Sequence, residues 1–555
     1  MGSTGSSIEA AELLASAGAA LGRRAWADAR ELYERALALG ESAEALEGLA
    51  VASWWLDDVD AAIAARERAY VMRRERAETI EAARVAGFLA WDYGAMRGAN
   101  AVANGWLQRA RRLVEDLEPS AEQAWLPLIE ASFHLDTDAR AVLRLSRQAA
   151  EYARAHGALD IEMTARTLQG LALVSLGHVD EGTRLLDEGT AAATAGELYD
   201  PIAIGSCCCN MIIACERSRD FDRAGQWCRQ LAAFCERTGH RPLLALCRAH
   251  HGTVLMVRGE WAEAEEQLAW AADALTILRP PLAGYARARL AQLRRRQGRL
   301  REARALLDRS GTHVLSPLVN AELALDEDDP PAALGHAERY LRGLGSEQPI
   351  ESAAALELLV PIRVRLGELS AAREAHAQLA AIAGSVRTDQ LRAAERSAAG
   401  RIALAERDLD LARRAFEDAI DLHVRSVAPF EAAQARLELA CTLLAQDRAA
   451  AGQEQALAAR ATFEQLGAAR AVRQADKLVA RLGGHSAAAK RAGMTRREVQ
   501  VLSLVAEGLS NRQVAERLVV SEHTVHRHLA NIYARLGVSS RAAAVALASE
   551  RDLLA

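Results

Sequence analysis

Apolar and polar positions follow a helical period along almost the entire chain. From about Ile8 to Leu482, apolar residues recur every three or four positions, the spacing at which side chains share one face of a helix. Turn segments with glycine or aspartate interrupt this period at intervals. The pattern therefore predicts an all-α fold of successive helices joined by tight turns.

A short motif recurs in this region: a turn residue, an apolar residue, two variable positions and then usually alanine. The clearest copies lie at residues 22–29, 58–62, 177–182, 220–224, 259–264, 298–303, 329–333, 367–372 and 408–412, with fainter ones near Val102, Val142 and Gly452. Consecutive copies are mostly about 40 residues apart, which is typical of a repeat array of about eleven or twelve units.

Each unit is predicted to be a helix, a tight turn and a second helix, with the alanine placed where the two helices cross. The second helices are expected to open at Trp26, Val59, Phe221, Trp261, Leu300, Leu369 and Leu409. The arrangement resembles tetratricopeptide repeats, with units longer than the usual length of about 34 residues. The resemblance implies an α-solenoid with a concave groove that binds a ligand or a protein partner.

The C-terminal stretch from Met494 to Leu547 reads instead as four short helices with clear start and stop signals. Thr495 and Glu498 are spaced as a capping box that opens the first helix, and Gly508 ends it. Further caps follow at Ser510 and Asn511 for the second helix, at Ser521 and Glu522 for the third, and at Ser539 or Ser540 for the fourth, after Gly537. Two helices joined by a tight turn make a helix-turn-helix.

The third of these helices has two distinct faces. Val525, Leu529, Ile532 and Leu536 recur at helical spacing, so they are expected to point into a small core. The opposite face carries His523, Arg527, Ala530, Asn531 and Ala534, with His526 at its edge. Small residues allow the backbone to approach DNA, and the polar ones can reach base edges or phosphates, so this helix is predicted to recognise DNA.

These residues resemble the LuxR-type helix-turn-helix of bacterial transcription regulators. The matching positions are Thr495-x-Arg497-Glu498, Gly508-x-Ser510-Asn511, Ser521-x-x-Thr524-Val525-x-x-His528, Ile532, Leu536 and Arg541. The resemblance implies that Arg512 and Thr524 touch phosphate, and that positions 526, 527 and 530 face the major groove. Ser521 and Arg535 are also expected at the DNA. It further implies that the fourth helix, with Ala542, Val545 and Ala546, makes the contact of a homodimer on DNA.

Two positions depart from the family pattern. His526 stands where most members have lysine, and Ala530 stands where some have a basic residue. Weaker attraction to phosphate is therefore expected, with more reliance on Arg527, whose fork of donors suits guanine.

Composition limits the chemistry that the repeat region can carry. Lys477 and Lys490 are the only lysines, so the phosphate-binding lysine of an ATPase loop is absent before position 477. Residues 485–555 hold 10 basic and 6 acidic side chains, which leaves 58 basic and 68 acidic ones for residues 1–484. A basic C-terminal part on an acidic body fits a module that meets DNA.

Three other features of the sequence are candidates for a functional site. Most cysteines fall in one region, near the histidines at positions 240, 250 and 251, at Cys207, Cys208, Cys209, Cys215, Cys228, Cys235 and Cys247. Their spacing does not match a zinc site, which favours buried packing over a redox or metal sensor and leaves the sensor open as an alternative. His523, His526 and His528 point in different directions, so no metal is expected there. Acidic pairs at turns lack a nucleophile, so neither enzymatic activity nor a cofactor is expected.

The sequence therefore predicts a sequence-specific transcription regulator bound to double-stranded DNA. Its expected parts are a flexible tail at 1–7, a repeat array at 8–482, a linker at 483–493 and a DNA-binding head at 494–555. No apolar run reaches the roughly 18 residues of a membrane helix, and the first residues lack a signal-peptide pattern, so a cytoplasmic location is expected. The alternative is an interaction scaffold or signalling adaptor whose head no longer binds DNA.

Overall fold

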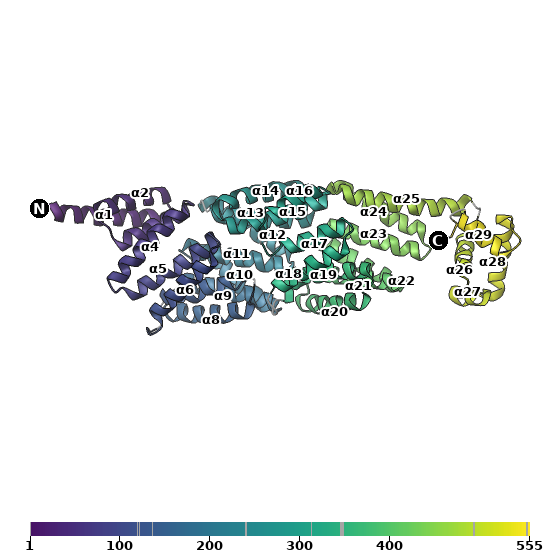
Figure 1. Cartoon of the computed structure of the whole chain (residues 1–555), viewed down its shortest axis with the longest axis horizontal. Helices are drawn as coiled ribbons and strands as arrows, with labels where there is room; N and C mark the ends of the chain where they lie inside the picture. Colours follow the sequence, from purple (N-terminus) through teal and green to yellow (C-terminus); the bar gives the residue numbers. More distant parts are fainter. Residues whose placement is uncertain are drawn as a thin grey trace. The chain divides into compact units, whose positions relative to one another are not determined.

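The computed structural model describes residues 2–118, 120, 122–135, 137–238, 241–311, 313–344, 349–491, 494–550 and 553–554. Nearly all of these residues are helical, and no strand occurs among them (Figure 1). The predicted all-α fold, a solenoid of helix pairs followed by a four-helix head, is confirmed.

Helices α1 to α24 follow one another in pairs, in most of which the two helices pack together, and α25 follows the last pair. The first helices of the pairs are α1 (Gly2–Gly22), α3 (Ala43–Trp55), α5 (Thr79–Trp91), α7 (Trp125–Phe133), α9 (Leu159–Ser175), α11 (Pro201–Ser218), α13 (Arg241–Arg258), α15 (Pro280–Gln297), α17 (Ser316–Asp326), α19 (Pro349–Leu366), α21 (Asp389–Ala405) and α23 (Pro429–Ala445). The second helices are α2 (Trp26–Leu39), α4 (Val59–Glu75), α6 (Asn100–Val114), α8 (Ala139–Ala155), α10 (Val179–Ala195), α12 (Phe221–Thr238), α14 (Trp261–Leu278), α16 (Leu300–Asp308), α18 (Pro330–Gly343), α20 (Leu369–Val386), α22 (Leu409–Arg425) and α24 (Ala449–Leu466).

The remaining elements are a π-helical turn, a short 3-10 turn and the C-terminal helices. They are η1 (Asp92–Met96), η2 (Glu122–Ala124), α25 (Ala469–Arg491), α26 (Arg496–Ala506), α27 (Asn511–Leu518), α28 (Glu522–Leu536) and α29 (Arg541–Glu550). The chain divides into two compact units. One holds Met1–Arg295, Leu300–Ile362 and Gln378–Leu391, and the other holds Arg296–Arg299, Arg363–Ala377 and Arg392–Ala555.

The second helices of the pairs begin where the sequence motif predicts. Trp26, Val59, Phe221, Trp261, Leu300, Leu369 and Leu409 are each the first residue of a helix. At several of these starts an aspartate caps the helix; Asp58 and Asp408, for example, accept hydrogen bonds from the N–H groups of Ala61 and Leu411 at 3.1 and 3.0 Å. The residue before each cap makes the turn in the left-handed conformation, as Asp57 does with φ 65°.

Small residues occupy the helix crossings, as the motif requires. The alanines of the clear copies are at most 1% exposed: Ala29, Ala62, Ala224, Ala264, Ala303, Ala333, Ala372 and Ala412. At the crossing of α9 and α10 both helices use glycine, and a Cβ added to Gly182 would lie 2.5 Å from the carbonyl oxygen of Gly170. Backbone meets backbone at this point, so even alanine does not fit without a shift of one helix.

Replacing Gly182 with alanine is therefore expected to lower the free energy of unfolding by about 1 to 3 kcal/mol, the usual cost of overpacking. Gly105 in α6 is a matched control, because nothing lies within 4 Å of a Cβ added there. Gly105→Ala should be neutral or stabilising, since alanine is the better helix former. Chemical denaturation of both variants measures the difference, and equal stability of the two would contradict a tight crossing.

The segments expected as tail and linker are largely helical. Helix α1 begins at Gly2, so most of the predicted tail at 1–7 continues that helix. Helix α25 runs to Arg491, and the predicted linker at 483–493 is therefore helix up to that residue, while Ala492 and Gly493 lie outside the described residues. The physical reason is composition: residues 486–491 include three alanines, a lysine and an arginine, all of which favour helix.

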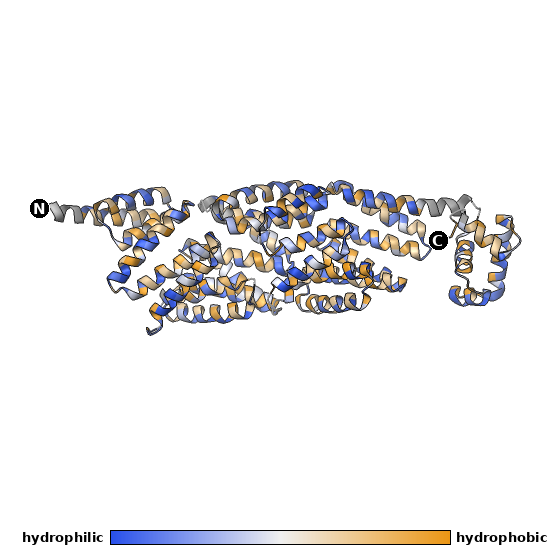
Figure 2. Ribbon diagram, in the orientation of Figure 1, coloured by the Kyte–Doolittle hydropathy of each residue, from blue (hydrophilic) through white to orange (hydrophobic). Residues whose placement is uncertain are grey.

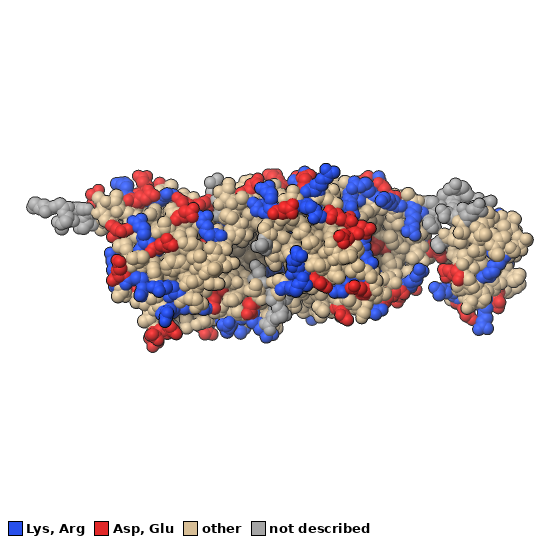
Figure 3. Space-filling view, viewed as in Figure 1, with Lys and Arg blue, Asp and Glu red and all other residues tan. Residues whose placement is uncertain are grey.

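Surface and core residues are mixed along the helices of the array. Apolar and polar residues share almost every helix (Figure 2), as packing of amphipathic helices requires. On the face drawn in Figure 3, acidic and basic side chains are interspersed over the array. Within the described part of the chain, no helix has both the length and the apolar character needed to span a bilayer.

The cysteine region of the array forms part of a hydrophobic core. Cys207, Cys208, Cys228 and Cys247 are buried together with apolar residues of neighbouring helices. Burial raises the pKa of Cys207 and of Cys228 to about 12. The thiolate is the form that reacts and binds metal, so these thiols suit packing rather than sensing. The side chain of Cys235 and residue His240 lie outside the described residues.

Candidate DNA-binding surface

The first helix of the head is held at its start by the predicted capping box. The N–H of Thr495 donates to Glu498 Oε2 at 2.7 Å, and the N–H of Glu498 donates to Thr495 Oγ1 at 3.4 Å. Val501, Leu502 and Val505 of this helix are buried in the core of the head, as expected from their spacing. Helix α26 is thus fixed by both its cap and its core face.

The second helix has a capping box that the sequence analysis missed. The Ser510 hydroxyl accepts the N–H of Gln513 at 3.4 Å, and the Gln513 side chain accepts the N–H of Ser510 at 2.8 Å. The spacing of a serine and a glutamine three residues later was the available signal. Helix α27 ends at Leu518, and its C-cap Val519 takes the left-handed conformation with φ 53° and has its side chain in solvent.

Helix α28 presents the two faces that its sequence predicts. Val525, Leu529, Ile532 and Leu536 are buried in the core of the head. The residues expected to face DNA are exposed: His523, His526, Arg527, Ala530, Asn531 and Ala534. Ser521 caps the helix by accepting the N–H of Thr524 at 3.1 Å, and Gly537 ends it in the left-handed conformation.

The two other arginines predicted at the DNA have partners within the head. Arg512 lies 3.1 Å from Glu516 one helical turn away, and both side chains are largely exposed. Arg535 pairs with Glu498 at 3.0 Å, although Glu498 itself is only 2% exposed. Burial alone would raise the pKa of Glu498, but the hydrogen bonds from Thr495 and the charge of Arg535 outweigh burial and hold that pKa below its usual value. Arg535 therefore ties α28 to the start of α26.

Two more arginines fix the turns of the head. Arg497 donates to the carbonyl oxygen of Leu518 at 2.7 Å, next to the turn before α28. Arg541 donates to Asn511 Oδ1 at 3.0 Å and to the carbonyl oxygen of Leu509, which joins the starts of α27 and α29. The sequence marked both arginines as motif positions but gave no sign of these acceptors, because backbone carbonyls look alike in a sequence.

The fourth helix of the head has one face on the core and one in solvent. Ser540 caps it by accepting the N–H of Ala543 at 3.2 Å, which decides between the two predicted serines. Ala544 and Ala548 are buried, whereas Ala542 and Ala546 are exposed and Val545 is half-buried. The residues predicted to contact a second head therefore include two small exposed side chains one helical turn apart.

The head matches a known family model. Residues 492–548 match the model described as bacterial regulatory proteins of the luxR family. This range contains the whole of α26, α27 and α28 and most of α29. The four-helix arrangement built above is therefore a LuxR-type helix-turn-helix domain.

Curated relatives match the same part of the chain. A putative HTH-type transcriptional regulator of Mycobacterium bovis is 48% identical over 58 residues, which are 10% of this chain and 7% of that protein. The probable transcriptional regulatory protein SgaR of Hyphomicrobium methylovorum is 50% identical over 54 residues, 10% of this chain and 26% of the relative. The transcriptional regulatory protein DegU of Brevibacillus brevis is 46% identical over 52 residues, 9% and 22% of the two chains. The chain thus spans a small fraction of the length of these relatives.

Solved structures of repeat proteins align with a larger part of the chain, at low identity. The Cut9-Hcn1 hetero-tetramer of APC/C aligns over 83% of this chain and 95% of its own, with 13% identity and a TM-score of 0.36. The Rap protein complexed with competence and sporulation factor aligns over 68% of this chain and 99% of its own, with 12% identity and a TM-score of 0.41.

Proposed function

Because residues 492–548 form a LuxR-type helix-turn-helix domain, we propose that this protein is a sequence-specific DNA-binding transcription regulator. In this proposal α28 enters the major groove with its exposed face toward the bases. The buried face of the same helix stays in the core of the head, so the domain docks without rearranging.

The observation that carries the proposal is the state of Arg527. It is exposed on the outer face of α28, and no other described residue gives it a hydrogen bond or an ion pair. The arginines Arg497, Arg512, Arg535 and Arg541 all have partners within the head. The Arg527 guanidinium, with the small Ala530 one helical turn away, is therefore suited to donate two hydrogen bonds to O6 and N7 of guanine.

The remaining predicted contacts divide into base and phosphate contacts. Asn531 lies on the same exposed face as Arg527 and suits adenine, with His523 and His526 beside it. Ser521 and Thr524 at the start of α28 are placed for phosphate, where the helix N-terminus favours an anion. The ion pair of Arg512 with Glu516 is exposed and stabilises the head little, so Arg512 can exchange Glu516 for phosphate.

Arg535 has a different role in this proposal from the one that the sequence indicated. Its pairing with the buried Glu498 makes it a positioning residue that holds the recognition helix against α26. The exposed Ala542 and Ala546 of α29 are proposed to contact a second head, so that two heads bind adjacent half-sites. The repeat array is proposed to sense a ligand or a protein partner, since stacked helix pairs offer an extended binding surface.

Selection of bound sequences from random double-stranded DNA tests the function, using the full chain at low salt. Enrichment of one sequence motif, arranged as two half-sites, is the expected result. Binding that enriches no sequence would contradict the proposal, because the uniform attraction of phosphates would then account for all of it.

A protein-interaction scaffold with an inactive head is the second candidate. The observation that favours it is the absence of fixed positive charge at His526 and Ala530 on the exposed face of α28. The same selection distinguishes the two candidates, since a scaffold retains its protein partner while it enriches no DNA site.

A further inference from the structure

Helices that are far apart in the sequence meet in the first compact unit. In a helical repeat array each repeat contacts its neighbours, so residues of α11 are expected to meet α9 and α13. Yet Arg217 of α11 lies 2.8 Å from Glu351 of α19, four pairs further along the chain. Two helix pairs that are far apart in the sequence therefore contact each other at this point.

The carboxylate of Glu351 is the centre of this contact. Arg217 Nη1 lies 2.8 Å from Glu351 Oε1, and it also donates to Ser175 Oγ at 2.7 Å. The Ser175 hydroxyl donates to the same Glu351 oxygen at 2.6 Å. The Arg217 and Glu351 side chains are only 12% and 8% exposed. Three groups from α9, α11 and α19 thus share one buried polar contact.

The residues after Arg217 make two more contacts of the same kind. Thr388 Oγ1, just before α21, donates to the carbonyl oxygen of Ser218 at 2.8 Å. Arg219 lies 2.8 Å from Glu357 of α19. We call Ser175, Arg217, Ser218, Arg219, Glu351, Glu357 and Thr388 the clasp. Each of its links is a hydrogen bond or ion pair.

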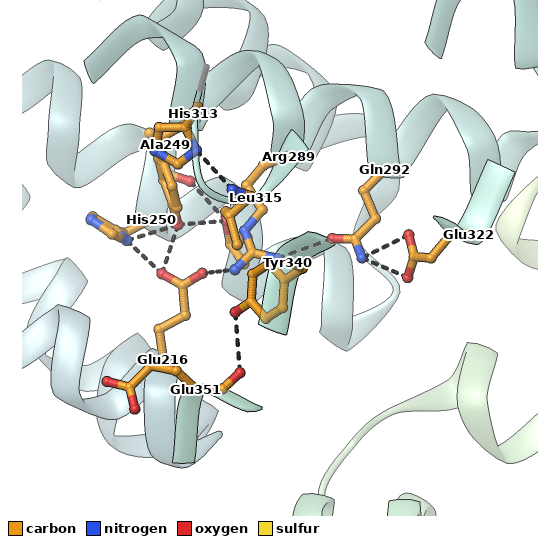
Figure 4. Close-up of polar contacts among 12 residues, drawn as sticks. Glu216, Ala249, His250, Arg289, Gln292, His313, Leu315, Glu322, Tyr340 and Glu351 are labelled. Carbon is orange, nitrogen blue, oxygen red and sulfur yellow. Dashed lines mark hydrogen bonds and ion pairs between the residues drawn. The ribbon is translucent and has the colours of Figure 1, made fainter. Parts of the chain in front are cut away.

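The residue before Arg217 connects the clasp to a network on the first helices of the following pairs (Figure 4). Glu216 accepts hydrogen bonds from Tyr285 at 2.6 Å and from Arg289, and His250 Nδ1 lies 2.7 Å from the same carboxylate. Burial opposes the charge of Glu216, but Arg289 and His250 outweigh it and hold its pKa below the usual range. Two consecutive residues of α11 therefore contact different helices: Glu216 contacts α13 and α15, and Arg217 contacts α19.

The balance of forces in the clasp favours reversible opening. Desolvation of a buried ion pair offsets most of the attraction between its charges, so the closed state gains little from the pair of Arg217 with Glu351. Moreover, Glu351 Oε2 is buried and accepts no hydrogen bond from any residue that the structure describes. Water restores the missing hydrogen bond when the clasp opens, which brings the two states close in free energy.

We propose that the clasp is a conformational switch that holds α19 and the start of α21 against α9 and α11, and whose opening separates these helices while each helix stays folded. The hydrogen bonds and ion pairs of the clasp define one closed arrangement of these helices, and they are few enough to break reversibly. Opening exposes the buried polar atoms of Ser175, Arg217 and Glu351, which is where a bound partner can shift the equilibrium. The effect of this switch on DNA binding rests on the proposed function, whereas the switch itself does not.

Hydrogen exchange of the full chain, read by mass spectrometry, tests the switch with Glu351→Gln. This variant keeps the size of the side chain and removes its charge. Backbone amides around residues 175–178, 349–357 and 385–391 are expected to exchange several-fold faster than in the unchanged protein, with the same helical content by circular dichroism. The matched control is Glu327→Gln, which removes an exposed ion pair with Arg304 between neighbouring helices and should leave these amides unchanged.

Charge reversal gives a second, independent arm. Arg217→Glu alone should accelerate exchange at the same amides, and combining it with Glu351→Arg should restore slow exchange in part, because the ion pair is re-formed in the opposite sense. Equal exchange in Glu351→Gln and Glu327→Gln would overturn the switch. Loss of helical content in Glu351→Gln would also overturn it, because the pair would then be needed to fold the array.

The switch and the proposed function fail in different ways. If Glu351→Gln opens the clasp but leaves DNA affinity unchanged, the switch exists and is not coupled to the head. If the unchanged protein enriches no DNA sequence, the proposed function fails while the exchange result still decides the switch.

Discussion

Arg527→Ala is expected to weaken binding to the selected DNA site by about 1 to 3 kcal/mol and to remove the preference at one base pair. The reason is that Arg527 is the exposed arginine of α28 that no described residue engages, so its donors are available for a guanine edge. Fluorescence anisotropy measures both effects. The affinity is determined for the selected site and for variants of it in which each base pair in turn is replaced by the other three. Because the side chain is in solvent, the variant should unfold at the same temperature as the unchanged protein.

Arg512→Ala is the matched control for this result. Arg512 is exposed on α27, where it pairs with Glu516. In the proposed function it contacts phosphate rather than a base. Its loss should weaken selected and scrambled DNA alike and lower the dependence of affinity on salt by about one ion. If Arg527→Ala behaved in the same uniform way, Arg527 would be a phosphate contact, and base recognition would have to lie elsewhere on α28.

Asp92→Ala is expected to lower the free energy of unfolding of the array by about 3 to 5 kcal/mol, the usual cost of leaving a buried charge without its partner. Asp92 is fully buried at the start of the π-helical turn η1 and forms an ion pair with Arg66, which is 5% exposed. Arg66 also lies over the ring of Phe88, with its guanidinium carbon 5.2 Å from the ring centre. Removing Asp92 therefore strands a guanidinium among apolar groups.

Chemical denaturation followed by circular dichroism measures this loss. Asp60→Ala is the control, because Asp60 pairs with Arg97 at the surface and exposed pairs contribute little. The control should unfold close to the unchanged protein. A similar effect of both substitutions would show that the pair of Arg66 with Asp92 is hydrated rather than buried.

The sequence predicted the head in detail because its signals are local. Thr495, Ser521 and Gly537 mark helix ends through contacts within one turn, and the period of Val525 to Leu536 defines a core face without reference to any other helix. The partner of Arg535 was not predictable in this way. Glu498 is 37 positions earlier in the chain. Its role in the capping box already explained why a glutamate stands there, so nothing in the sequence pointed to a second partner.

The array shows the same division between local and distant signals. The starts of α2, α4 and α12 and the alanines at the crossings follow from a motif of a few residues, since helix capping and close packing of a pair depend on neighbours in the chain. The helical conformation of residues 483–491 was not expected, because the glycines at 483 and 484 were taken as a break, whereas the alanines after them continue α25. The functional roles of the site residues stay predictions until DNA binding is measured.

By itself, then, the sequence determined the all-α class, the repeat period, the helix starts and the two faces of α28. Only the tertiary structure decided which charges meet. Among 68 basic and 74 acidic side chains any pairing is possible from the sequence, and the choice of Glu351 for Arg217 depends on how the stacked repeats bring α11 and α19 together. Local signals act within a turn of helix, whereas ion pairs between distant helices depend on the summed rotations of all the repeats between them.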